Sequence, residues 1–81
     1  MQTRVPKYSM EEHARMAAEL YEKIRPVVEP GNHGRILAVD VDSGDHELGD
    51  DMTSPVDRLL ARHPDAQIWR FRIGSPYVYR I

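Results

Sequence analysis

The segment AQIWRFRI, residues 66–73, alternates between apolar and polar side chains over most of its length. Such alternation is typical of a strand with one buried face, because successive strand side chains point to opposite sides of a sheet. One side would carry three large apolar residues and the other both arginines: Trp69, Phe71 and Ile73 on the first, and Ile68, Arg70 and Arg72 on the second. The chain is therefore expected to build a sheet whose apolar side other elements cover.

Three further segments are predicted to be strands. Each combines β-branched, aromatic or other apolar residues with turn residues at its ends. They lie at residues 35–41, 46–49 and 76–81. The turn sequence DSGD separates the first two, and Gly74-Ser75 precedes the last, so the chain should contain two hairpins.

The loop lengths of the two hairpins predict their registers. A two-residue loop at 43–44 pairs Val41 with His46, and this register gathers the apolar residues of the hairpin on one face. A three-residue loop with Gly44 in a bulge is the alternative, but it mixes Val39 and Val41 with Asp45 and Glu47. In the second hairpin, a two-residue loop pairs Arg70 with Tyr79.

The first helix is predicted to begin at a capping box, SMEE, in which Ser9 and Glu12 bond to each other's backbone N–H groups. It should run from Met10 to about Arg25, because Pro26 removes a hydrogen-bond donor. Its apolar residues cover an arc of roughly 200°, about twice the width that one sheet usually covers. We therefore expect a homodimer or higher oligomer with contacts at Met10, Ala14, Ala18 and Tyr21.

A second helix is predicted over residues 53–64. Ser54 would be its N-cap, Pro55 its first helical residue, and Pro64 its stop. The order of elements is then helix, strand, strand, helix, strand, strand.

With 81 residues, the chain is long enough for one domain. We expect a flexible N-terminal arm at 1–8 and a single α+β domain at 9–81. Its fold class would be α-β-β-α-β-β, with one mostly antiparallel four-stranded sheet and two helices on one face. A right-handed crossover would place strand 66–73 parallel beside strand 35–41.

The stretch AVDVDSGDHELGDD, residues 38–51, is rich in carboxylates and imitates the start of a calcium-binding loop. Such a loop needs oxygen ligands at positions 1, 3 and 5, glycine at position 6 and glutamate at position 12. Counted from Asp40, the glycine comes one position early, Asp45 occupies position 6, and Asp51 stands at position 12. We therefore predict an acidic hairpin without a calcium site.

That hairpin would place like charges opposite one another, with Asp40 facing Glu47 and Asp42 facing Asp45, and such pairs are destabilising. We expect the two arginines of strand 66–73 to neutralise these acids across the sheet. The alternative is a recognition patch for a protein or for single-stranded RNA, built from arginine and tyrosine. That patch would consist of Arg70, Arg72, Tyr77 and Tyr79.

Composition narrows the classes of function. The chain has no cysteine, which excludes disulfides, thiolate zinc sites and cysteine nucleophiles. Its net charge of −2 gives no general attraction to nucleic acid. No apolar run approaches the roughly 20 residues of a membrane span, and the first residues lack the apolar core of a signal peptide. We therefore expect a cytoplasmic protein.

The sequence carries no recognised catalytic arrangement. No two of its four histidines share a short metal-binding spacing. No serine stands on a nucleophile elbow, and there is no glycine-rich phosphate loop. We therefore expect no metal, no cofactor and no catalytic residue, so that an uncharacterised hydrolase ranks third among the functions considered.

Several short motifs resemble those of a group of small bacterial α+β proteins without an assigned function. They are R-P-x-V-E at a helix end, the strand G-R-x-x-A-V-D, the turn S-G-D, the break P-D-A and the strand end R-I-G, within residues 19–81. Domains of this group are sometimes encoded beside toxin-like or retropepsin-like partners. The resemblance implies a non-enzymatic protein-interaction module, antitoxin-like or regulatory. A small RNA-binding module is the second hypothesis.

Overall fold

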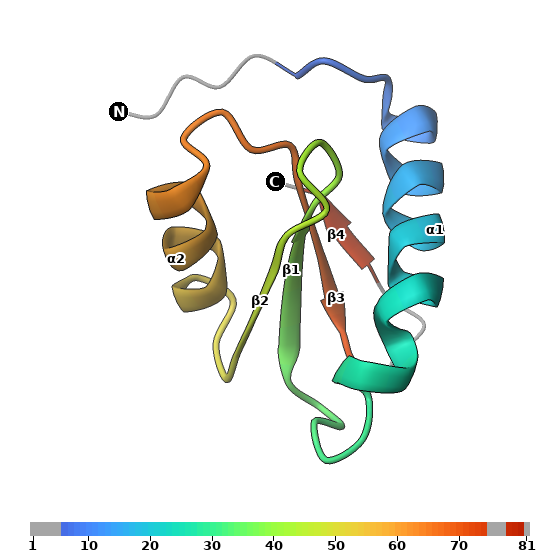
Figure 1. The fold of residues 1–81 in the computed structure, drawn as a ribbon, viewed down its shortest axis with the longest axis vertical. Helices are drawn as coiled ribbons and strands as arrows, with labels where there is room; N and C mark the ends of the chain where they lie inside the picture. Colours follow the sequence, from blue (N-terminus) through green and yellow to red (C-terminus); the bar gives the residue numbers. More distant parts are fainter. Residues whose placement is uncertain (1–5, 75–77, 81) are drawn as a thin grey trace.

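The computed structural model describes residues 6–74 and 78–80, the last three by their backbone alone. Its elements follow the chain as α1 (Met10–Val28), β1 (Ile36–Asp40), β2 (His46–Gly49), α2 (Ser54–Arg62), β3 (Ile68–Arg72) and β4 (Val78–Arg80). Strands β2, β1 and β3 form a three-stranded antiparallel sheet. The three residues of β4 pair along the outer side of β3, which gives the order β2-β1-β3-β4 (Figure 1).

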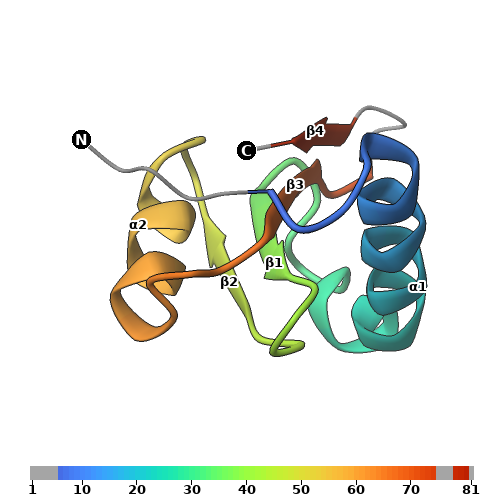
Figure 2. The same ribbon diagram turned by 90° about the horizontal axis from the view of Figure 1, so that it is seen from above.

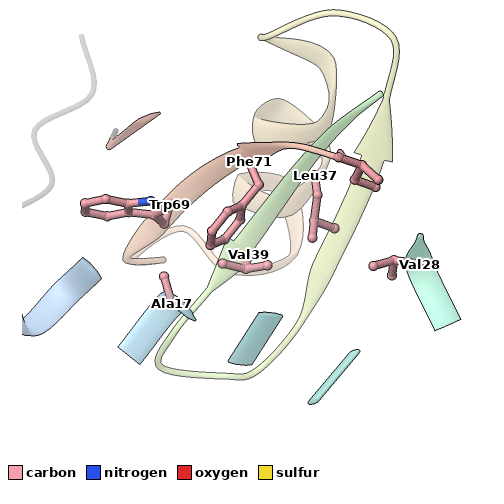
Figure 3. Close-up of a cluster of buried hydrophobic side chains, with 7 residues drawn as sticks. Ala17, Val28, Leu37, Val39, Trp69 and Phe71 are labelled. Atoms are coloured by element: carbon pink, nitrogen blue, oxygen red, sulfur yellow. The ribbon is translucent and has the colours of Figure 1, made fainter. Parts of the chain in front are cut away.

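Strand β1 is buried from both sides, since all five of its residues are buried. Leu37 and Val39 belong to a core that includes Ala17 of α1 (Figure 3). Ala38 belongs to a second core, with Leu59 of α2. The two helices therefore lie on opposite faces of the sheet (Figure 2).

The predicted architecture is wrong in two respects. The body of the sheet has three strands, to which β4 adds only three residues, and the helices do not share a face. The physical reason is that β1 reads ILAV, an unbroken apolar run with side chains to bury on each side, as in strands covered on both faces. The predicted apolar side of β3 is confirmed, because Trp69, Phe71 and Ile73 all lie in the core under α1.

The predicted parallel pairing of β1 with β3 is also wrong. β3 runs antiparallel to β1, with Val39 opposite Trp69 and Leu37 opposite Phe71. α2 connects β2 to β3, and β2 runs antiparallel to β1. The helical crossover therefore makes β3 parallel to β2, and β1 lies between them.

The β1–β2 hairpin has a longer turn than predicted. Val39, not Val41, pairs with His46, so both proposed loop lengths are wrong. The turn occupies residues 41–44 and is closed where the Gly44 N–H donates to the Asp40 carbonyl at 2.8 Å. The register differs from the preferred prediction by two residues, which leaves side chains on their predicted faces because the strand period is two.

The ends of the helices follow the sequence signals in part. The capping box is confirmed, with the Glu12 N–H donating to Ser9 Oγ at 3.1 Å. α1 continues through Pro26 into its last turn, where the missing N–H costs a single hydrogen bond. The prediction that Ser54 is the N-cap of α2 is wrong, because Thr53 occupies that position and Ser54 is the first helical residue. The Asp51 carboxylate accepts the Ser54 N–H at 2.6 Å and the neighbouring Thr53 N–H at 2.9 Å.

A substitution at Gly49 tests how closely α2 approaches β2. A Cβ there would lie 2.7 Å from Cδ of Pro55, and a proline ring has little freedom to move away. Gly49→Ala should therefore lower the free energy of unfolding by about 1–3 kcal/mol, measured by urea melts. Asp50→Ala, at the neighbouring exposed position, is the control and should change it by less than about 1 kcal/mol. Equal stability of Gly49→Ala and the unaltered chain would contradict this packing.

Candidate functional site

The turn between β1 and β2 is built around a buried carboxylate. Asp40 is 2% exposed, and a carboxylate at such a position must be hydrogen-bonded. It accepts hydrogen bonds from the Ser43 hydroxyl at 2.6 Å, from the N–H groups of Asp42 and Ser43, and from the Gln67 N–H at 2.9 Å. Asp40 therefore fixes the shape of the turn and joins it to the start of β3.

Asp42, at the tip of this turn, binds the segment that precedes α1. Its carboxylate accepts Lys7 Nζ at 2.7 Å and the Tyr8 hydroxyl at 2.5 Å. Hydrogen bonds from Lys7 and Tyr8 hold the pKa of Asp42 below its usual value. The Lys7 N–H also donates to Gln67 Oε1 at 3.1 Å. Residues 7 and 8 thus lie across the turn and the start of β3.

The remaining acids of the hairpin bind α2. Glu47 pairs with Arg58 Nε at 2.9 Å and with Arg62, while Asp45 pairs with Arg62 Nη2 at 2.8 Å and with His63 Nε2 at 2.9 Å. Partial burial opposes ionisation of Asp45, but hydrogen bonds from His63 and Arg62 outweigh it and lower the pKa of Asp45 to about 2. We call these five residues the β2–α2 charge cluster.

A match of two periods makes the cluster possible. Residues two apart on a strand are separated by about 6.6 Å, and residues four apart on a helix by about 6 Å along the axis. Acids at 45 and 47 therefore meet arginines at 58 and 62 when the two elements lie side by side. Both spacings are visible in the sequence, although the arginines were not among the predicted site residues.

The predicted partners of the hairpin acids are therefore wrong. Arg70 Nη1 donates to the Met52 carbonyl at 2.8 Å, and Arg72 Nη1 donates to the Gly34 carbonyl at 3.0 Å. Asp45 and Glu47 pair with arginines of α2 instead, because α2 covers the face of the sheet that was expected to be open. Asp42 bonds to Lys7 and Tyr8. Tyr79 lies opposite Arg70 in the confirmed β3–β4 register, but its side chain and Tyr77 lie outside the described residues.

Two shallow grooves flank the β1–β2 turn. The α1–turn groove, of about 320 Å³, has half-buried apolar side chains at Met16, Leu20 and Val41. Its full lining is Met16, Glu19, Leu20, Lys23, Val41, Asp42, Ser43 and Gly44. The α2–turn groove, of about 340 Å³, is lined by Asp40, Asp42, Ser43, Arg62, His63, Pro64, Asp65 and Ala66.

The α2–turn groove brings a serine, a histidine and aspartates together, which is a combination used in nucleophilic catalysis. In a catalytic triad, the imidazole bonds to the nucleophile with one nitrogen and to the acid with the other. Here the Ser43 hydroxyl donates to Asp40 at 2.6 Å, whereas His63 Nε2 bonds to Asp45 at 2.9 Å. The two groups are thus engaged with different carboxylates.

The four predicted oligomer contacts lie in unlike surroundings. Met10 is 59% exposed and Ala18 is exposed, whereas Ala14 and Tyr21 are half-buried against the core. The Tyr21 ring stacks on Phe71 with centroids 4.7 Å apart. Burial, together with its hydrogen bond to Glu29, raises the pKa of Tyr21 to about 12. Tyr21 is therefore part of the chain's own packing.

Metal ligands do not gather in the described part of the chain, where no three His, Asp or Glu side chains are placed to hold an ion. Among the described helices, none is long and apolar enough to cross a membrane. Comparisons with protein-family models, with curated proteins and with solved structures found no match to this chain. The resemblance to short bacterial proteins stays a prediction.

The β2–α2 charge cluster should make stability depend on pH. The pKa of Asp45, about 2, lies below its ordinary value of 3.8, so its contribution is present above about pH 4 and is lost as the pH falls towards 2. Asp45→Asn should lower the free energy of unfolding at pH 7 by about 1 kcal/mol, a small value because the group is partly exposed and screened. It should also reduce the fall in the free energy of unfolding between about pH 4 and pH 2, which is the acid limb of the stability curve.

Urea melts between about pH 7 and pH 2.5 measure both effects. Asp65→Asn, which changes an exposed carboxylate on the rim of the α2–turn groove, is the matched control and should leave the acid limb in place. Identical pH curves for Asp45→Asn and the unaltered chain would show that this pairing does not stabilise the fold.

Proposed function

We propose that this chain is a small protein-interaction module that binds another protein in the α1–turn groove. One observation carries the proposal: α1 packs against β1 and β3, and leaves half-buried apolar side chains beside the turn. Leu20 and Val41 are among the side chains that line this groove. An apolar surface of this kind favours an occupant that removes it from water.

The groove has the chemistry of a transient binding site. Its apolar floor is bordered by Glu19, Lys23 and Asp42, which provide charges of both signs. An apolar centre with a polar rim is the usual anatomy of a protein interface. A groove of about 320 Å³ is large enough for one side chain of a partner. We therefore propose a partner that inserts an apolar anchor, such as leucine or phenylalanine, between charged neighbours.

A regulatory or antitoxin-like role fits a module of this size. The resemblance to small bacterial domains supports that role. The bonding of Ser43 and His63 to separate carboxylates supports binding over catalysis. RNA binding by the arginine-tyrosine face is the less favoured alternative, because Arg70 is half-buried and held by the Met52 carbonyl.

Photo-crosslinking in the native cell tests this proposal. A photoreactive phenylalanine replaces Lys23, on the groove, or Glu22, its exposed neighbour on α1. The expected result is a protein adduct from position 23 and none from position 22. Met16→Glu places a charge in the groove and should weaken binding at least tenfold, because burying one apolar side chain contributes about 1.5–3 kcal/mol.

Val27→Glu is the matched control for that substitution, because Val27 lies on the same helix, is 78% exposed and does not line the groove. It should leave the adduct unchanged. Equal loss from both variants, or equal adducts from both crosslinking positions, would contradict a specific site. An adduct of twice the chain's mass would identify a second copy instead, and a ribonuclease-sensitive adduct would favour the RNA alternative.

A further inference from the structure

The outer edge of β2 is one of the two edges of the sheet. Hydrogen bonds between antiparallel strands use the backbone groups of alternate residues. The Asp40 N–H donates to the Asp45 carbonyl at 2.9 Å, so the backbone N–H and C=O groups of Asp45 point towards β1. Those of Glu47 and Gly49, two and four residues later on the strand, point the same way. The N–H and C=O groups of His46 and Leu48 therefore point away from the sheet.

Three of these four outward groups already bond to side chains. The His46 N–H donates to Asp45 Oδ1 at 2.8 Å. Arg62 Nη2 donates to the His46 carbonyl at 3.4 Å, and Arg58 Nη2 donates to the Leu48 carbonyl. The Leu48 N–H is the fourth. An incoming strand would need the same four groups, so it would have to displace both arginines.

Ion pairs within the β2–α2 charge cluster hold both arginines against the carbonyls of the β2 edge. Arg58 uses Nε for Glu47 and Nη2 for the Leu48 carbonyl, so one planar guanidinium spans a carboxylate and a backbone oxygen. Arg62 does the same with Asp45 and the His46 carbonyl. The forked geometry of arginine suits such paired contacts better than the point charge of lysine.

We infer that Arg58 and Arg62 close the β2 edge to strand addition, and that the partner they exclude is a second copy of this chain. Unprotected strand edges pair readily with other strands. Two β2 edges related by a twofold axis would offer each other the same groups, which is the symmetry of most homodimers. The inference is independent of the proposed function, because the α1–turn groove is lined by residues of α1 and of the β1–β2 turn and not by these arginines.

The test replaces both arginines with alanine and measures self-association and hydrogen exchange at the β2 edge. Arg58→Ala/Arg62→Ala should self-associate at least tenfold more strongly than the unaltered chain, measured by sedimentation velocity across protein concentrations. Hydrogen exchange supplies the site-specific readout. The Leu48 amide should exchange rapidly in the unaltered chain, since it faces outward, and should become protected as the variant associates.

Two further variants complete the test. Arg15→Ala/Arg25→Ala removes the same charge from exposed positions of α1 and should leave association unchanged. Arg58→Ala alone frees the Leu48 carbonyl while Arg62 still covers the His46 carbonyl and keeps its ion pairs. It should therefore associate more strongly than the unaltered chain but less strongly than the double variant, and it supplies the result if the double variant unfolds. The inference is overturned if folded Arg58→Ala associates no more than the unaltered chain, if the α1 variant associates equally, or if the Leu48 amide of the unaltered chain is already protected by association.

Discussion

Burial of β1 from both faces is the constraint on which the rest of the structure depends. A strand with apolar side chains on each side needs a covering layer on each side, so α1 and α2 are separated by the sheet (Figure 2). The same burial encloses the Asp40 carboxylate at the end of the strand, where it must be hydrogen-bonded. The turn wraps around that carboxylate, and its length places Asp45 and Glu47 opposite the arginines of α2.

The two helices contact different pairs of strands, so the surfaces beside them differ. α2 covers β1 and β2, whereas α1 covers β1 and β3. On the α2 side, the helix lies close enough to β2 for its arginines to reach the edge carbonyls. On the α1 side, the region beside the turn keeps half-buried apolar side chains and a groove. The arginines of α2 thus cover the carbonyls of the β2 edge, whereas the groove on the α1 side keeps apolar side chains at its surface.

The sequence predicted the local elements better than their arrangement. Capping at Ser9 and Glu12 and the β3–β4 register are set by neighbouring residues, so local patterns were enough. α2 covers the face of the sheet opposite α1 because β1 has apolar side chains to bury on both faces. The sequence prediction gave that strand only one buried face. The hairpin turn depends on a buried carboxylate bonding to Gln67, a contact across 27 residues that no local pattern reveals. The arginine partners were missed for the same reason, since their identity follows from where α2 lies.

The most direct test of this account is a methyl–methyl nuclear Overhauser measurement on the labelled chain, observed from Leu59 of α2. The account expects cross-peaks from the Leu59 methyls to Ala38 and Ile68, which share its core. It expects none to Leu37 or Val39, which face α1 together with Ala17. Strong cross-peaks from Leu59 to Val39 would place both helices on one face of the sheet and would contradict the double burial of β1.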